Sequence, residues 1–299
     1  MRLARALLRA SLPVLLPLLV LAMATEAQQP RKVFISVDME GIGGIGTGAL
    51  TSASGKDYAT GRRLMTDEVN AVVAAIFAAG PAEVLVNDSH GDMQNLLHTE
   101  LDPRVTYIQG AVKPFGMVEG LDASFDAAIF IGYHARAGTG RGFLAHTGSG
   151  IVKGLWINGI EVGEGEMNAA YAGALGVPVI LASGDSTFAA QFTQNVPAAT
   201  VVTKTAITPV SARLRHPGRV QADLTDATRR ALATLPDARP WRVGSPVEVR
   251  LQFTDVTRPQ ILEAIPGVRQ LDGYTVEFSA PDMAAAYRLI RLMYRFVSI

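Results

Sequence analysis

The feature of this sequence that most constrains its fold is the run Ala-Ala-Ile-Phe-Ile-Gly at 127–132, which has no polar side chain. A strand this apolar has to be covered on both faces, which is typical of a parallel sheet between helices. Similar short runs occupy 33–37, 83–86, 105–108 and 177–182. Apolar side chains at helical spacing fill 61–78, between the first two runs. The alternation predicts an α/β fold with a mainly parallel sheet covered by helices.

The second part of the chain has a different texture. Five prolines interrupt residues 209–246, and the strand patterns at 247–253 and 275–278 precede a helical pattern over 281–296. We therefore expect a larger α/β domain over 28–200 and a smaller C-terminal α+β domain over 201–299. Within the first part, Asn158-Gly159 between two apolar runs predicts a β-hairpin.

The first 27 residues have the pattern of a secretory signal peptide. Three arginines at positions 2, 5 and 9 precede an apolar stretch from Leu12 to Met23, and small residues suited to cleavage follow. A retained membrane anchor is the alternative, but a spanning helix needs roughly 20 apolar residues and this stretch contains Pro13 and Pro17. We expect residues 1–27 to be removed and the mature protein to be periplasmic or secreted, without membrane attachment.

Composition narrows the possible chemistry. The chain has no cysteine, so a disulfide framework, a thiol nucleophile and a zinc–thiolate site are excluded. Its formal net charge is zero, and nothing in it indicates a nucleic acid partner. Any metal has to be held by imidazole and carboxylate groups. The chain has five histidines: His90, His98, His134, His146 and His216.

Polar residues follow three of the predicted strands where each strand ends. Asp38 and Glu40 follow the first strand, His90 follows the second, and His134 follows the strand at 127–132. Sites in open α/β sheets lie at the carboxyl ends of the strands, which are about 4.8 Å apart. Two carboxylates held this close repel each other unless a cation lies between them. Imidazole with carboxylate suits zinc, so we predict a metal site here.

Four motifs, in order along the chain, resemble the D-aminopeptidase family of zinc metallopeptidases (DppA type). The motifs are Ser36-Val-Asp-Met-Glu-Gly41, Val86-Asn-Asp-Ser-His90, Lys113-Pro-Phe-Gly-Met-Val-Glu-Gly-Leu121 and Gly132-Tyr-His-Ala-Arg-Ala137. The similarity is strong over about residues 32–186 and looser beyond. It implies two zinc ions per chain, hydrolysis of short peptides with an N-terminal D-residue, and a homo-oligomer in the form of a ring-like decamer.

The resemblance also assigns roles to single residues. It implies that Asp38 bridges the two metals and that Glu40, His90, His134 and Glu164 complete the ligand set. It further implies that His146 is the catalytic residue, which the family describes as a nucleophile. Physical reasoning leaves a second role open for it, because a histidine near a metal-activated water also serves in proton transfer or oxyanion stabilisation.

Several alternatives remain at this stage. Glu166, two residues after Glu164, competes with it as a ligand. Another two-metal hydrolase, such as a phosphoesterase, would use Lys113 or Arg136 to hold phosphate. A non-catalytic secreted protein that binds metal or peptide is the other possibility. We expect His98 and His216 to be structural.

Overall fold

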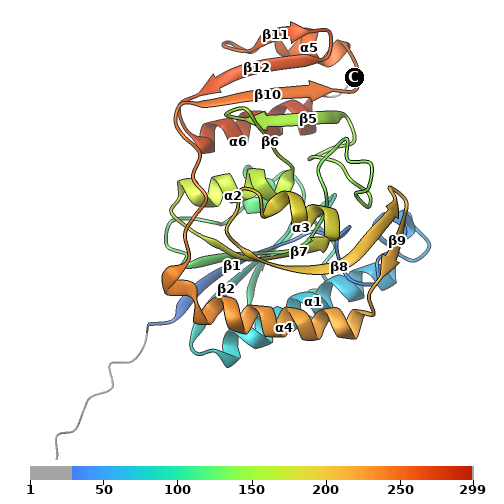
Figure 1. Cartoon of the computed structure of the whole chain (residues 1–299), viewed down its shortest axis with the longest axis vertical. Helices are drawn as coiled ribbons and strands as arrows, with labels where there is room; N and C mark the ends of the chain where they lie inside the picture. Colours follow the sequence, from blue (N-terminus) through green and yellow to red (C-terminus); the bar gives the residue numbers. More distant parts are fainter. Residues whose placement is uncertain (1–28, 298–299) are drawn as a thin grey trace, which may run out of the picture.

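The computed structural model describes residues 29–297, so the predicted signal peptide at 1–27 lies outside the described residues. The described chain forms four layers, in which two sheets alternate with two layers of helices (Figure 1). The lower sheet has seven strands, and the upper one has five antiparallel strands.

The seven-stranded sheet confirms the predicted α/β fold. Its order is β3-β2-β1-β4-β7-β8-β9, and every pair is parallel except β8 with β9. Its strands are β1 (Arg31–Val37), β2 (Ala82–Asp88), β3 (Thr106–Ile108), β4 (Ala127–Tyr133), β7 (Val179–Asp185), β8 (Ala199–Thr208) and β9 (Ser211–Leu214). As the apolar run predicted, every residue of β4 is buried.

Helices cover both faces of this sheet. The lower face carries α1 (Tyr58–Ala78) and α4 (Pro217–Ala233), and the upper face carries α2 (Glu164–Ala174) and α3 (Ser186–Phe192) (Figure 1). Side chains alternate along β1, so Val33 and Ile35 join the core of α1 and α4, whereas Phe34 joins the core of α2. Burying each such side chain stabilises the fold by roughly 1.5–3 kcal/mol.

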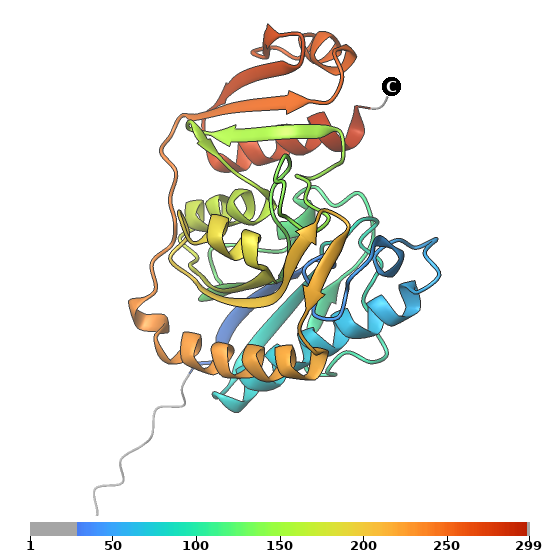
Figure 2. The same ribbon diagram turned by 45° about the vertical axis from the view of Figure 1, so that its right-hand side comes forward.

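The upper sheet pairs strands from distant parts of the chain, in the order β11-β12-β10-β5-β6. Helix α6 (Met283–Arg291) packs between this sheet and α2, and a π-helical turn, η4 (Leu292–Phe296), extends it (Figures 1 and 2). The remaining elements are β5 (Val152–Ile157), β6 (Ile160–Glu161), β10 (Val247–Phe253), β11 (Arg269–Asp272), β12 (Thr275–Ala280), α5 (Thr257–Leu262), η1 (Gly48–Leu50), η2 (Gly116–Val118) and η3 (Leu235–Asp237).

The sheets divide the chain differently from the expected boundary between residues 200 and 201. That boundary falls inside β8, and α4 also belongs with the seven-stranded sheet. Conversely, β5 precedes residue 200 but pairs with β10 in the upper sheet. The predicted hairpin at Asn158-Gly159 is confirmed, because β5 pairs with β6 across it. Both turn residues have positive φ, as this type of tight turn requires.

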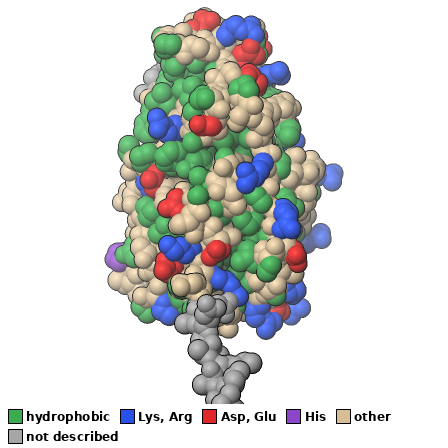
Figure 3. Space-filling model, turned by 90° about the vertical axis from the view of Figure 1, so that its left-hand side faces the viewer, with side chains coloured by type: hydrophobic (Ala, Val, Ile, Leu, Met, Phe, Trp, Pro, Cys, Tyr) green, Lys and Arg blue, Asp and Glu red, His purple; other side chains and the backbone are tan. Residues whose placement is uncertain are grey.

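Three further features concern the helices and the surface of the described chain. Among residues 29–297, no helix is long and apolar enough to cross a membrane. On the face shown in Figure 3, basic and acidic side chains are interspersed rather than gathered by sign. The cap of α6 is Asp282, whose side chain accepts a hydrogen bond from the Ala285 N–H.

Candidate metal centre and active site

The three strand ends singled out in the sequence converge. Strands β2, β1 and β4 are neighbours, so the residues that follow them meet at one edge of the sheet. Asp38 Oδ1 lies 3.2 Å from His90 Nδ1, and Asp38 Oδ2 lies 3.3 Å from His134 Nε2. The carboxylate of Asp38 therefore lies between the two imidazoles.

Two more carboxylates complete the cluster. Glu40 Oε2 lies 3.0 Å from His90 Nδ1, and Glu164 Oε2 lies 3.6 Å from His134 Nε2. Two groups of three potential ligands result, Asp38 with Glu40 and His90, and Asp38 with His134 and Glu164. In each group the ligand atoms lie within 4.8 Å of one another. Asp38 belongs to both groups, so it is placed where a bridging carboxylate would be.

The turn after β1 owes its shape to close backbone packing. The Gly41 N–H donates to Gly132 O at 2.7 Å, and a Cβ at Gly41 would collide with the carbonyl oxygen of Tyr133. Only glycine fits so near another backbone. The Asp38 N–H donates to Ile131 O at 2.8 Å, which fixes the start of the turn. Packing of the turn on β4 thus sets the direction in which Asp38 and Glu40 point.

A buried lysine and a buried glutamate hold the same turn from below. Lys204 on β8 donates from Nζ to Ile45 O at 2.8 Å and also to Glu40 O. Glu68 on α1 accepts the Gly43 N–H at 2.6 Å. Burial lowers the pKa of Lys204 to about 7 and raises the pKa of Glu68 to about 7. Such groups are costly to bury, so their contacts with the turn point to a positioning role.

Each imidazole of the cluster has one nitrogen against a backbone carbonyl. His134 Nδ1 lies 3.0 Å from Ala135 O, and His90 Nε2 lies 2.8 Å from Thr51 O. When these nitrogens donate, the other nitrogen of each ring carries a lone pair directed at the carboxylates. This is the arrangement by which proteins orient histidine ligands of metals.

Charge in the cluster is strongly coupled. Burial lowers the pKa of His134, but the carboxylate of Glu164 and then that of Asp38 outweigh it and hold the pKa well above its ordinary value. Burial likewise lowers the pKa of His90, and Glu40 with Asp38 raises it well above the ordinary value. Burial, reinforced by Glu40, raises the pKa of Asp38 to about 7. The carboxylates of the cluster therefore stabilise a positive charge that lies between them.

Buried atoms without hydrogen-bond partners test whether a metal fits here. Among the described residues, Asp38 Oδ2, Glu40 Oε2 and His134 Nε2 are buried and make no hydrogen bond. Buried polar atoms are nearly always satisfied, and each of these three residues belongs to groups at metal-ligand spacing. Divalent cations held by those groups would satisfy these atoms, and the nitrogen and oxygen donor set is one that zinc accepts. The residues present fit a metal.

Glu164 and Glu166, which competed as ligands in the sequence, have different positions. Both are buried, but Glu164 Oε1 accepts the Gly148 N–H at 2.5 Å while its Oε2 faces His134. Glu166 Oε2 accepts the Gly163 N–H at 3.0 Å and caps the start of α2. Glu166 belongs to none of the groups with metal-ligand spacing among the described residues.

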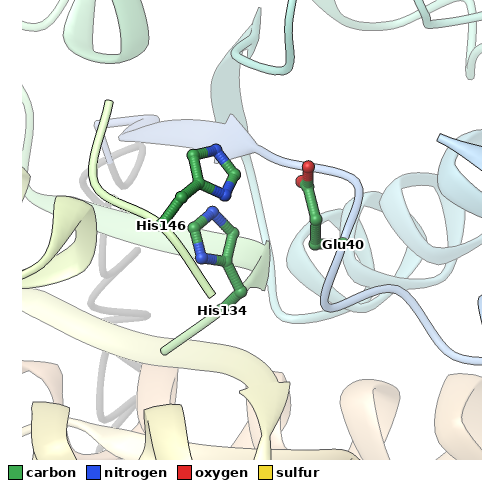
Figure 4. A group of neighbouring side chains, drawn as sticks. All are labelled: Glu40, His134 and His146. Atoms are coloured by element: carbon green, nitrogen blue, oxygen red, sulfur yellow. The ribbon is translucent and has the colours of Figure 1, made fainter. Parts of the chain in front are cut away.

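His146 lies beside the cluster and remains partly exposed. Its ring stacks on that of His134, with centroids 4.2 Å apart (Figure 4). Its Nε2 lies 3.6 Å from Glu164 Oε1. Its Nδ1 lies 2.9 Å from Leu144 O, which turns Nε2 toward the cluster. His146 also forms a group with Glu40 and His134 at metal-ligand spacing, so its position suits either a ligand or a proton-transfer group.

The other residues weighed in the sequence lie outside the cluster. Lys113 Nζ donates to Asn87 Oδ1 at 2.6 Å, and Arg136 Nη2 pairs with Glu161 at 3.0 Å. Both side chains are thus engaged by partners that do not belong to the ligand cluster. His98 stacks on Tyr107, and His216 accepts the Gly218 N–H as the cap of α4.

A cavity of about 280 Å³ opens onto the cluster, and part of its wall was missed in the sequence. Its lining includes Asp38, His90, His146 and Glu164. The lining also includes Arg291, Tyr294 and Arg295, from the end of α6 and from η4. The signal that the sequence offers is Arg291, a charged residue on the buried face of the helix predicted over 281–296 from its apolar residues.

Comparisons with known proteins agree with this geometry. Residues 31–292 match the model of a family described as D-aminopeptidase. The chain is 36% identical over 264 residues to a D-aminopeptidase of Bacillus subtilis (strain 168), covering 88% of this chain and 96% of the relative. It is also similar, with a TM-score of 0.85 and 36% identity, to a solved structure described as "Zn-dependent D-aminopeptidase DppA from Bacillus subtilis, a self-compartmentalizing protease". That match covers 88% of this chain and 96% of the other.

Proposed function

Since this chain belongs to the D-aminopeptidase family, we propose that it is a two-zinc aminopeptidase that releases an N-terminal D-amino acid from short peptides. The observation that carries the proposal is the position of Asp38, whose two oxygens face different imidazoles and belong to two ligand groups. Two-metal hydrolases, aminopeptidases among them, share this plan.

Each ligand group would hold one zinc. Asp38, Glu40 and His90 would bind one ion, and Asp38, His134 and Glu164 the other. Zinc bound there would lower the pKa of a water to about 7 and polarise the scissile carbonyl. The protein keeps these ligands buried and orients their rings through backbone carbonyls, so little rearrangement is needed when substrate binds.

His146 is the residue of this site that we propose as the catalytic group. Its Nε2 faces Glu164 at the edge of the cavity, and its ring is the most exposed imidazole of the cluster. Leu144 O holds Nδ1 of the ring, so the accessible Nε2 is suited to take up a proton and return it to the leaving amine. We favour proton transfer over a nucleophilic role because Nε2 of His146 lies beside the buried carboxylate of Glu164.

The rival functions find less support in the geometry. A phosphoesterase usually places arginine or lysine against the phosphate at its metals. Lys113 and Arg136 are held by other partners, so a phosphoesterase would have to use Arg291 and Arg295, which line the cavity. A binding protein without activity would not need a partly exposed histidine beside a shared carboxylate. These rivals become outcomes of the test.

A panel of chromogenic substrates tests the proposal on the zinc-loaded protein. We expect faster release of nitroaniline from D-alanine p-nitroanilide than from the L-alanine compound, and no hydrolysis of p-nitrophenyl phosphate. Hydrolysis of the phosphate ester alone would favour a phosphoesterase. Bound zinc without turnover of any of the three would indicate a binding protein.

The assembly and the compartment are parts of the same proposal. The similar solved structure is described as self-compartmentalizing, which supports a homo-oligomer, and we propose a decamer for this chain. The signal-peptide pattern at 1–27 supports a periplasmic or secreted enzyme acting on peptides derived from the cell wall, where D-amino acids are abundant. Light scattering of the purified protein and the N-terminal sequence of the exported protein test these two points.

A further inference from the structure

The cavity beside the metal ligands also carries positive charge. Arg291 and Arg295 both line it, four residues apart, which places them near the same helical face. The only acidic side chains that line the cavity are Asp38 and Glu164, and both belong to the ligand cluster. A substrate in this cavity therefore meets both the anionic metal ligands and two guanidinium groups that stand apart from the ligand cluster.

Arg291 is almost completely buried, with 4% of its surface exposed. Its Nη2 donates to Lys113 O at 3.1 Å, and its Nε is buried without a hydrogen-bond partner. Within residues 29–297, no carboxylate lies within ion-pair distance of its guanidinium. A buried charge without a counter-ion is costly, which indicates that an anionic ligand supplies one.

The surroundings of Arg291 are shaped to receive it. Gly116 has a φ of +48°, and a Cβ at this position would collide with Nη1 of Arg291. Gly148 lies flat on the ring of Tyr294, where a Cβ would come within 2.5 Å of the ring. Glycines on two separate loops thus let the backbone close around the end of the last helix.

Arg295 extends the positive charge to the rim. It is exposed, and its Nη2 donates to Gly91 O at 3.1 Å, one residue after the ligand His90. The arrangement leads from solvent past Arg295 to Arg291 within the cavity. Long-range attraction by the exposed arginine would bring an anionic group to the buried one.

We propose that Arg291, assisted by Arg295, binds the C-terminal carboxylate of the substrate. Guanidinium groups pair with carboxylates through two parallel hydrogen bonds, which adds direction as well as charge. A cavity of about 280 Å³ is at the small end for ligand sites, so the peptide between the metals and Arg291 has two or three residues. The inference rests on the proposed peptidase function and defines its substrate as a di- or tripeptide with a free C-terminus.

The test compares D-alanyl-D-alanine with its C-terminal amide on the zinc-loaded enzyme. We expect kcat/KM to be roughly 100-fold higher for the free acid, mainly through KM. In Arg291→Gln the ratio between acid and amide falls close to one. In Arg295→Gln it falls by a few fold, because the lost charge is solvated. Arg288→Gln is the matched control: Arg288 is exposed on the same helix, lies outside this cavity, and leaves the ratio unchanged.

The outcomes separate this inference from the proposed function. Equal turnover of acid and amide by the wild-type enzyme would overturn the carboxylate site while leaving the peptidase intact. A preference that survives in Arg291→Gln would also overturn the assignment. If that variant does not fold, the wild-type comparison and Arg295→Gln decide. No turnover of either peptide or of D-alanine p-nitroanilide would instead refute the peptidase.

Discussion

The two walls of the cavity are built in different ways. The strand wall, by which we mean Asp38 and His90, which line the cavity, together with their fellow ligands Glu40 and His134, comes from the ends of three adjacent parallel strands. The helix wall, formed by Arg291, Tyr294 and Arg295, comes from the last helical segment, more than 150 residues later. The strand wall is suited to metal and chemistry, whereas the helix wall is suited to recognition, so the reaction and its substrate preference reside on separate parts of the fold.

The largest expected effect comes from breaking the strand wall at His134. Alanine there removes the imidazole that faces both Asp38 and Glu164, so zinc content and activity fall together, with kcat/KM reduced on the order of 1,000-fold or more. Metal analysis and D-alanine p-nitroanilide turnover measure both. His98→Ala is the control, since its ring stacks on Tyr107. Full turnover by His134→Ala would contradict the metal assignment.

The next largest effect on activity is expected from His146→Ala, at a residue that lies between the two walls. We expect kcat to fall about 100- to 10,000-fold, the usual contribution of a general acid–base group, while the zinc content stays that of the wild type. Equilibrium dialysis followed by metal analysis separates the two effects. Loss of one zinc along with activity would show that His146 is a ligand instead.

A smaller effect is expected from Lys204→Met, which changes what supports the strand wall without touching a ligand side chain. The variant loses the hydrogen bonds to Glu40 O and Ile45 O, and supporting contacts of this kind are worth about 10- to 100-fold in metal affinity. Competition with a zinc-binding dye reports the affinity. Lys153→Met, an exposed lysine on β5, is the matched control. An unchanged affinity would make Lys204 purely structural.

The smallest effect distinguishes two glutamates on one helix. Glu166→Ala removes a cap of α2 and should lower the free energy of unfolding by roughly 1 kcal/mol, with zinc binding unchanged. Glu164→Ala, only two residues away, should lose zinc. Thermal unfolding and metal analysis of both variants provide the comparison. Zinc loss in Glu166→Ala would instead show that Glu166 is a metal ligand.

The strand wall was predictable because it depends on local order along the chain. Apolar runs identify the strands, parallel strands share a carboxyl edge, and the polar residue after each run has to lie there. The position of Glu164 came from the family resemblance, because the residues around it do not by themselves show that α2 begins at Glu164. Gly165 weakens the helical signal, yet Phe188 packs within 2.7 Å of where its Cβ would be. Tertiary packing therefore decides that helix start.

The helix wall was not predictable because it depends on pairing between distant segments. Strand β10 pairs with β5, some 95 residues earlier, and this pairing places α6 over the cavity. No local pattern encodes which segment a strand will pair with, so the sequence alone does not show that β5 joins the upper sheet and β8 the lower one. The apolar stripe of the last helix was recognised, but not that Arg291 within it would face the metal ligands.

The central claim is that Asp38 lies between two zinc ions that act together. Stepwise addition of zinc to the metal-free protein, followed by turnover of D-alanine p-nitroanilide, tests it most directly. The account predicts that activity rises with added zinc and reaches its plateau at about two ions per chain. Full activity at one zinc per chain, or in the metal-free protein, would contradict it.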